Sequence, residues 1–116
     1  MKKFRLLASY GALLLMAACS SSYEHTSLKE AYADSFMMGC AVNPLHTGGR
    51  LEQARDLILE HFNAISPENC LKPEAVQPRP GVWTFEEADE YVEFGEKHDL
   101  WMLGHTLVWH NQTPSF

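Results

Sequence analysis

Apolar and polar positions along the chain form blocks that predict the order strand, helix, strand, helix, strand. The strands are expected in three apolar runs of strand length, at residues 36–42, 62–65 and 101–103. Helices are expected at residues 51–62 and from residue 84, because apolar side chains recur there every three or four positions. Such alternation implies parallel strands joined by right-handed crossovers, and therefore an α/β fold.

Each predicted helix has one apolar face. In the first helix this face is expected to comprise Leu51, Ala54, Ile58 and Phe62, and in the second Ala88, Tyr91, Val92 and Gly95. The second helix is expected to begin with a capping box at residues 84–87, in which a hydroxyl and a carboxylate satisfy backbone donors. A short lead-in helix is expected within residues 27–33. Residues 71–82, with three prolines and a glycine, are expected to form a loop.

The N-terminal residues are typical of a secretion signal. Residues 1–18 join a basic start to an apolar stretch that is shorter than the roughly 20 residues of a membrane-spanning helix. Small residues before Cys19, and serines after it, resemble a bacterial lipobox. This resemblance implies a lipid anchor on Cys19 in the bacterial cell envelope. We expect the anchor to lie in the outer membrane. The alternative is an ordinary signal peptide with an incidental cysteine. The expected division is a lipoprotein signal peptide (1–18), a tether and lead-in helix (19–34), and a folded part (35–116).

Charge and cysteine content narrow the classes of function. The 116-residue chain has a net charge of −6, and removal of residues 1–18 leaves six cations against fifteen anions, a net charge of −9. An acidic chain is a poor nucleic-acid binder, because phosphate contacts require clustered Lys and Arg. A negative net charge does not oppose the binding of an uncharged polymer. Cys40 and Cys70 are expected to be unpaired, with Cys40 as a small buried apolar residue, although an exported setting would permit a disulfide.

Polar side chains follow the end of every predicted strand. Asn43 follows the first strand, and Glu68, Asn69 and Lys72 follow the second. Active sites of parallel barrels lie at this end of the strands. The carboxylate, amide and ammonium groups together suit the hydroxyls of a sugar. The plainer alternative is a solvated loop in which Glu68 and Lys72 form a surface ion pair.

A second polar segment follows the third predicted strand. His105 could bond a hydroxyl or take part in acid–base chemistry, and Trp109 could cover the C–H face of a sugar; core packing is the alternative for each. His105 and His110 lie five positions apart with no nearby cysteine and no HExxH helix, so no metal site is expected. No cofactor is expected either.

Three ordered segments, at residues 62–74, 80–89 and 104–110, resemble the family 10 glycoside hydrolases, and residues 35–44 resemble the first strand of that family. These enzymes are endo-β-1,4-xylanases on a (β/α)8 TIM barrel, so the resemblance implies that this chain holds about the first three βα units. It implies that the substrate-binding residues are Glu68, Asn69, Lys72 and Gln112 on the glycone side, and His105 and Trp109 beside the sugar whose bond is broken. Cys70 departs from the larger side chain usual at its position.

The resemblance implies a retaining endo-1,4-β-xylanase that hydrolyses internal bonds of xylan, with two Glu roughly 5–5.5 Å apart as nucleophile and acid/base. In the family these follow the fourth and seventh strands, so neither is expected in residues 1–116, and the chain alone is expected to be inactive. A non-catalytic xylan-binding surface lipoprotein is the competing hypothesis. Three strands leave open edges and uncovered apolar faces, so residues 20–116 are not expected to unfold in a cooperative thermal transition.

Overall fold

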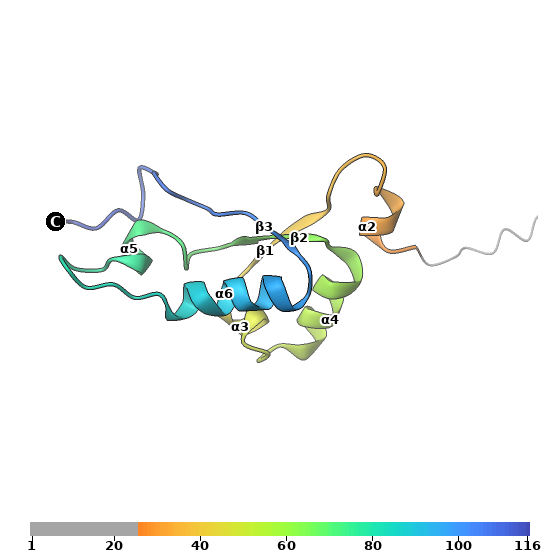
Figure 1. The fold of residues 1–116 in the computed structure, drawn as a ribbon, viewed down its shortest axis with the longest axis horizontal. Helices are drawn as coiled ribbons and strands as arrows, with labels where there is room; N and C mark the ends of the chain where they lie inside the picture. The colour runs from red at the N-terminus through yellow and green to blue at the C-terminus, as the bar shows by residue number, and fades with distance from the viewer. Residues whose placement is uncertain (1–25) are drawn as a thin grey trace, which may run out of the picture.

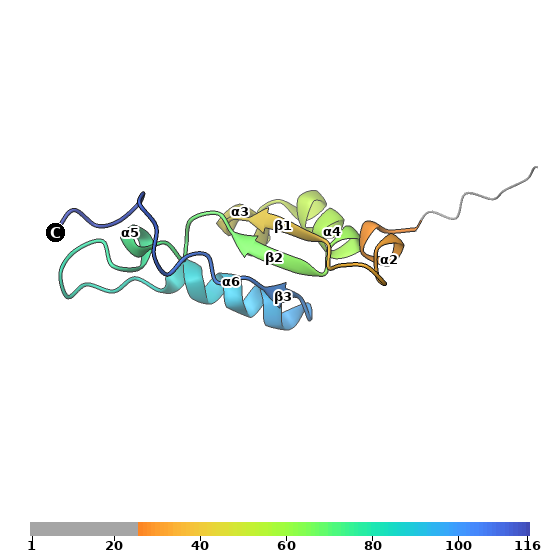
Figure 2. The same cartoon turned by 90° about the horizontal axis from the view of Figure 1, so that it is seen from above.

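The computed structural model describes residues 26–116, which form a three-stranded parallel sheet with helices on one of its faces (Figures 1 and 2). The predicted signal peptide and Cys19 lie outside the described residues. The elements in chain order are α2 (Leu28–Ala31), β1 (Gly39–Val42), α3 (Pro44–Thr47), α4 (Glu52–His61), β2 (Ala64–Pro67), α5 (Pro73–Val76), α6 (Glu86–Lys97) and β3 (Trp101–Met102). Across residues 26–116, every helix is too short or too polar to cross a membrane.

The sheet confirms the predicted parallel arrangement, with the strands in the order β1-β2-β3. Gly39 of β1 pairs with Ala64 of β2, which pairs in turn with Trp101 of β3. The second strand begins two residues later than predicted. Phe62 instead ends α4, where its N–H donates to the Ile58 carbonyl at 2.9 Å.

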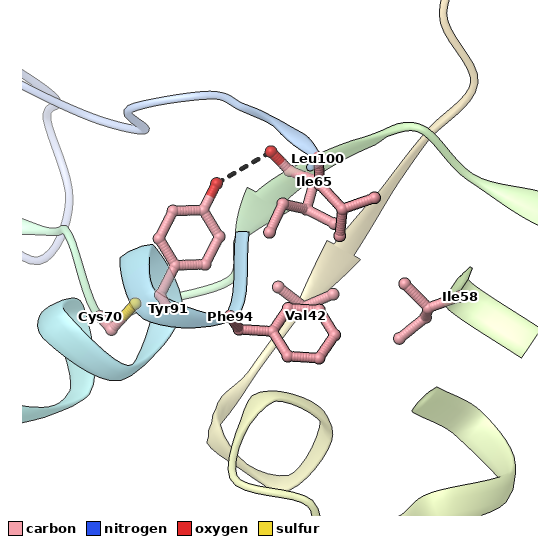
Figure 3. Packing of buried hydrophobic residues seen from close by; sticks show 7 residues of the cluster. All are labelled: Val42, Ile58, Ile65, Cys70, Tyr91, Phe94 and Leu100. Carbon is pink, nitrogen blue, oxygen red and sulfur yellow. Dashed lines mark hydrogen bonds between the residues drawn. The ribbon is translucent and has the colours of Figure 1, made fainter. Parts of the chain in front are cut away.

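The helix-covered face of the sheet carries the hydrophobic core. Side chains alternate across a strand, so every second residue of β1 and β2 points toward α4 and α6. The buried cluster comprises Val42, Ile58, Ile65, Cys70, Tyr91, Phe94 and Leu100 (Figure 3). In α6 the predicted apolar face is confirmed at Ala88, Tyr91 and Gly95. The prediction for Val92 is wrong, because this residue is exposed and Phe94 is buried instead.

Tyr91 joins α6 to the sheet. Its hydroxyl lies 2.9 Å from the Ile65 carbonyl (Figure 3) and 3.2 Å from the Leu103 carbonyl, so one O–H is shared between two neighbouring strand segments. Burial raises the pKa of Tyr91 to about 12. The phenol therefore stays protonated and can donate throughout the physiological pH range.

The predicted capping box of α6 is wrong. The helix begins at Glu86, after Phe85, and has no side-chain cap. The Thr84 hydroxyl donates to the Ala75 carbonyl, and the Thr84 N–H donates to the Val76 carbonyl at 3.0 Å. Carbonyls at the end of α5 have no partner within that short helix, so they compete with the first turn of α6 for the Thr84 hydroxyl. Thr84 therefore connects the loop to α5.

Two short helices occur where only irregular chain was expected. Both α3 and α5 begin with a proline at their first position, Pro44 and Pro73, where a missing N–H costs nothing. Asn43 caps α3 by accepting from the Leu45 N–H at 3.0 Å. These helices turn the chain immediately after β1 and shortly after β2.

The predicted lead-in helix is confirmed as α2. Ser27 and Glu30 form its capping box, and hydrogen bonds from Ser27 lower the pKa of Glu30. The Lys29 ammonium donates to the Leu59 carbonyl at 2.6 Å, and the Leu28 N–H donates to His61 Nδ1 at 3.3 Å. This helix therefore docks on the C-terminal end of α4.

Cys40 and Cys70 are free, as predicted, but the more buried of the two is Cys70 and not Cys40. Cys40 is half-buried and packs against the core cluster from β1, whereas Cys70 is a full member of that cluster. Burial raises the pKa of both thiols, and the carboxylate of Glu87 adds to this effect at Cys70. The sulfur of Cys70 thus contributes packing beneath the loop that follows β2.

The opposite face of the sheet is uncovered by the described residues. It presents a hollow of about 400 Å³ with small side chains at its centre, among them Gly39, Ala41 and Ala64. Large apolar groups border these small ones: Trp101 is 54% exposed and Leu103 is 45% exposed.

Candidate functional site

The polar side chains predicted to meet at the C-terminal ends of the strands do so. The Asn43 amide, after β1, donates to the Glu68 carboxylate, after β2, at 3.1 Å. The Glu68 N–H continues the strand pairing by donating to the Val42 carbonyl at 2.9 Å. These bonds fix the ends of two neighbouring strands side by side and leave one Glu68 carboxylate oxygen without a partner within residues 26–116.

Asn69 is the junction between the loops after β2 and β3. Its side-chain oxygen accepts from the Lys72 ammonium at 3.0 Å and from the Gln112 amide at 3.2 Å. Two donors saturate that oxygen, and the Asn69 amide N–H groups make no hydrogen bond within residues 26–116. The Gln112 backbone carbonyl also accepts from the Glu74 N–H at 2.9 Å, which anchors the second loop to α5.

Lys72 is a buried cation without a carboxylate partner among the described residues. Lys72 is only 8% exposed, and its ammonium lies 4.6 Å from the centre of the Trp109 ring. A cation within about 6 Å of an indole face is stabilised by the ring quadrupole. The predicted alternative, a surface ion pair between Glu68 and Lys72, is therefore wrong. An ammonium has three N–H groups and Asn69 uses one, so two remain for a ligand.

His105 and Trp109 complete the group. Their rings lie 6.1 Å apart at 55°, and the His110 ring lies edge-on to the indole at 5.4 Å. The Thr113 hydroxyl donates to the Trp109 carbonyl at 2.9 Å, and the peptide bond between His105 and Thr106 is cis. The Trp109 indole is thus close to one ammonium and two imidazoles.

The structure brings together the residues predicted from the sequence and adds one. The strand-end network, as we call it, comprises Glu68, Asn69, Lys72, His105, Trp109 and Gln112, with Asn43 as a seventh member. Asn43 lies directly after the first strand but is not among the predicted site residues. Its bond to Glu68 depends on two strands being neighbours, which its place in the sequence does not indicate.

The network offers hydrogen-bonding groups and an aromatic ring. Glu68 supplies a carboxylate, Lys72 an ammonium and His105 an imidazole, while the amides of Asn43, Asn69 and Gln112 supply further donors and acceptors. Within the same residues, no three His, Cys, Asp or Glu side chains cluster in a way that could hold a metal ion. The arrangement is suited to binding a neutral polyhydroxy ligand, whose hydroxyls both donate and accept.

Comparison with known proteins places this geometry in a family. The family model described as Glycosyl hydrolase family 10 matches residues 27–116. The chain is 42% identical over 95 residues to Endo-1,4-beta-xylanase A of Halalkalibacterium halodurans, across 82% of this chain and 23% of that protein. It is 45% identical over 93 residues to Beta-1,4-xylanase of Dictyoglomus thermophilum, across 80% of this chain and 25% of that protein. The chain thus spans about a quarter of the length of these curated relatives.

Solved structures give the same result. A GH10 endoxylanase retrieved from sugarcane soil metagenome superposes with a TM-score of 0.72 at 44% identity, over 78% of this chain and 27% of that one. A mutant structure in complex with xylotriose superposes with a TM-score of 0.69 at 39% identity, over 76% and 26%. The parallel strands with their helices on one face are therefore the first βα units of a TIM barrel, as the sequence predicted. The chain belongs to glycosyl hydrolase family 10.

Proposed function

We propose that residues 26–116 form the glycone-side part of the substrate cleft of a retaining endo-1,4-β-xylanase. The observation that carries this proposal is the strand-end network, in which Asn69, Lys72 and Gln112 share one hydrogen-bonded centre beside Trp109. It lies at the edge of the sheet where parallel barrels bind their substrates. The xylanase relatives, and a similar solved structure in complex with xylotriose, support xylan as the polymer.

Each group has a distinct role in holding the sugar. The two remaining Lys72 N–H groups and the Asn69 amide donate to xylose hydroxyls, and the Glu68 carboxylate accepts from them. Trp109 covers the C–H face of a ring, and His105 bonds the sugar next to the cleaved linkage. Because Lys72 is already desolvated and held by Asn69, little ordering remains to be done when the substrate binds.

In this proposal, residues 26–116 bind and position xylan but do not cut it. Retaining hydrolysis passes through a glycosyl-enzyme intermediate and uses two carboxylates roughly 5–5.5 Å apart. The family places these after its fourth and seventh strands, whereas β1 to β3 correspond to the first three. Fixing the glycone sugar still serves catalysis, because correct placement of the reacting bond removes much of the entropic barrier.

Binding and hydrolysis by the 116-residue chain test the proposal. Xylotriose should shift the amide NMR signals of residues around the network, and no reducing sugar should be released from xylan. Lys72→Ala should weaken binding about tenfold or more, since loss of a charge-assisted hydrogen bond also leaves its partner unpaired. The matched control is Lys97→Ala, which removes an exposed lysine of α6. Equal affinities of these two variants would refute the assigned site, and retaining hydrolysis by the chain alone would refute the division of labour.

We also propose that Cys19 carries a lipid that anchors the protein in the cell envelope, on the basis of the lipobox resemblance. Wild-type protein should then fractionate with membranes, and Cys19→Ala should be soluble after export. The competing function is a xylan-binding surface lipoprotein that performs no catalysis. Reading the coding DNA beyond the Phe116 codon would distinguish it from the enzyme. A continuation into a fourth strand ending in Asn-Glu favours the enzyme.

A further inference from the structure

A second hollow lies beside the strand-end network, and none of the network residues lines it. It encloses about 210 Å³ between α5, the loop that precedes α6 and the segment after Gln112. Its lining includes Pro73, Gln77, Trp83, Thr113 and Pro114. We propose that this hollow, here called the Trp83 pocket, binds a further sugar ring of the same xylan chain that the network holds.

The Trp83 pocket is continuous with the network along two separate segments. Lys72 belongs to the network and the next residue, Pro73, lines the pocket; Gln112 belongs to the network and the next residue, Thr113, lines the pocket. Neighbouring Cα atoms are about 3.8 Å apart, so the two sites are one residue step from each other on both segments. The Glu74 N–H bond to the Gln112 carbonyl, at 2.9 Å, keeps the segments together. A linear polymer that leaves the network along this side therefore meets the pocket.

The indole of Trp83, which lines the pocket together with Phe116, is accessible and held in place. Trp83 is 57% exposed, so part of its ring can contact a ligand. Phe85 stacks parallel to it, with centroids 5.9 Å apart at 5°. A tight turn precedes it, in which the Val82 N–H donates to the Arg79 carbonyl at 3.0 Å and Gly81 adopts φ of 72°. Together with the two bonds from Thr84 to α5, these contacts orient the indole before any ligand arrives.

The chemistry and size of the pocket suit one pyranose ring. The indole offers a flat apolar surface for C–H groups, and the Gln77 amide, which makes no side-chain hydrogen bond within residues 26–116, offers a donor and an acceptor at its side. Its 210 Å³ is below the roughly 300–1,000 Å³ of pockets that enclose a whole drug-sized ligand. The pocket therefore fits a single added ring and not an independent oligosaccharide.

This inference rests on the proposed function, and the two are separated by varying the length of the ligand. The 116-residue chain is titrated by calorimetry with xylobiose, which fills the network, and with xylotetraose, which extends beyond it. We expect tighter binding of xylotetraose, by about two- to tenfold if the added contact equals that of an aromatic pair. Trp83→Ala should remove this gain and leave the affinity for xylobiose unchanged, while Trp83→Phe should retain most of it.

Trp101→Ala is the matched control, since Trp101 is equally exposed but lies on the open face of the sheet. Phe116→Ser provides a second variant of the pocket that touches no core residue, and circular dichroism verifies that each variant keeps its helices. Equal affinity for the two ligands, or a gain that survives in both Trp83→Ala and Phe116→Ser, would overturn the Trp83 pocket alone. Absence of binding to either ligand would overturn the proposed function and the pocket with it.

Discussion

The two faces of the sheet are made by the same three strands but have opposite surroundings. On one face Val42 and Ile65 are each 1% exposed beneath α4 and α6. On the other, Trp101 and Leu103 remain about half exposed beside small residues of β1 and β2. Since neighbouring residues of a strand point to opposite faces, position along the chain decides whether an apolar side chain stabilises this fold. Hydrophobicity alone does not distinguish Ile65 from Trp101.

The largest expected effect follows from truncation on the covered face. Ile65→Ala should lower the free energy of unfolding by about 2–5 kcal/mol, because it leaves a cavity at the centre of the core. Trp101→Ala removes a larger side chain from the open face and should change it by about 0.5 kcal/mol or less. Far-UV circular dichroism and the dispersion of the amide NMR spectrum at 25 °C would distinguish the two. Comparable losses of structure would show that the open face is buried in solution.

A smaller effect is expected when the Tyr91 hydroxyl, which joins α6 to the sheet, is removed. Tyr91→Phe should cost about 0.5–1.5 kcal/mol, the usual net contribution of one hydrogen bond. Its clearer signature is pH dependence. The folded-state pKa of about 12 lies above the ordinary value near 10, so Tyr91 should add no pH dependence below pH 10 and should destabilise the fold as pH rises from about 10 to about 12.

Far-UV circular dichroism of both proteins, recorded at intervals through that pH range, would measure the difference. Wild type and Tyr91→Phe share every other titrating group, so the gap between their two signals isolates Tyr91. The gap should narrow as the phenol of the wild type ionises. A gap that stays constant to pH 12 would contradict a buried, donating hydroxyl.

The smallest effect on stability is expected from a substitution on the open face, which should nevertheless change the binding of a hydrophobic dye. Trp101→Ser should leave the free energy of unfolding within about 0.5 kcal/mol of wild type and reduce the fluorescence of a bound hydrophobic dye. Val92→Ser, at an exposed position of α6, is the matched control and should leave dye binding unchanged. Equal dye binding by these variants would place the dye elsewhere than on the open face.

Much of this fold was predictable because its signals are local. Apolar periodicity located β1, β3, α4 and α6 to within a few residues, and the alternation of strands and helices predicted parallel pairing. The errors arose where a distant partner competes. Thr84 matched a capping box, but the carbonyls of Ala75 and Val76 take its hydrogen bonds.

The position of the candidate residues at the strand ends was predictable, but the hydrogen bonds between them were not. The strand-end rule brought all six predicted residues to one edge, and nothing in their spacing indicated that Asn69 accepts from both Lys72 and Gln112. The stack of Lys72 on Trp109 likewise joins two loops that are distant in sequence. Cys70 lies in the loop after β2 among polar neighbours, and only the folded structure shows that its side chain turns inward to the core.

The order β1-β2-β3 has a consequence for how the chain assembles. Each strand pairs with the one made just before it, and the connecting segment between partners is only a few dozen residues long. A chain delivered from its N-terminal end, by the ribosome or through a translocation pore, therefore finds each partner already present and has only a short loop to close. Growth of the sheet is vectorial: every new βα unit extends an existing edge, and no earlier pairing has to be undone to admit it.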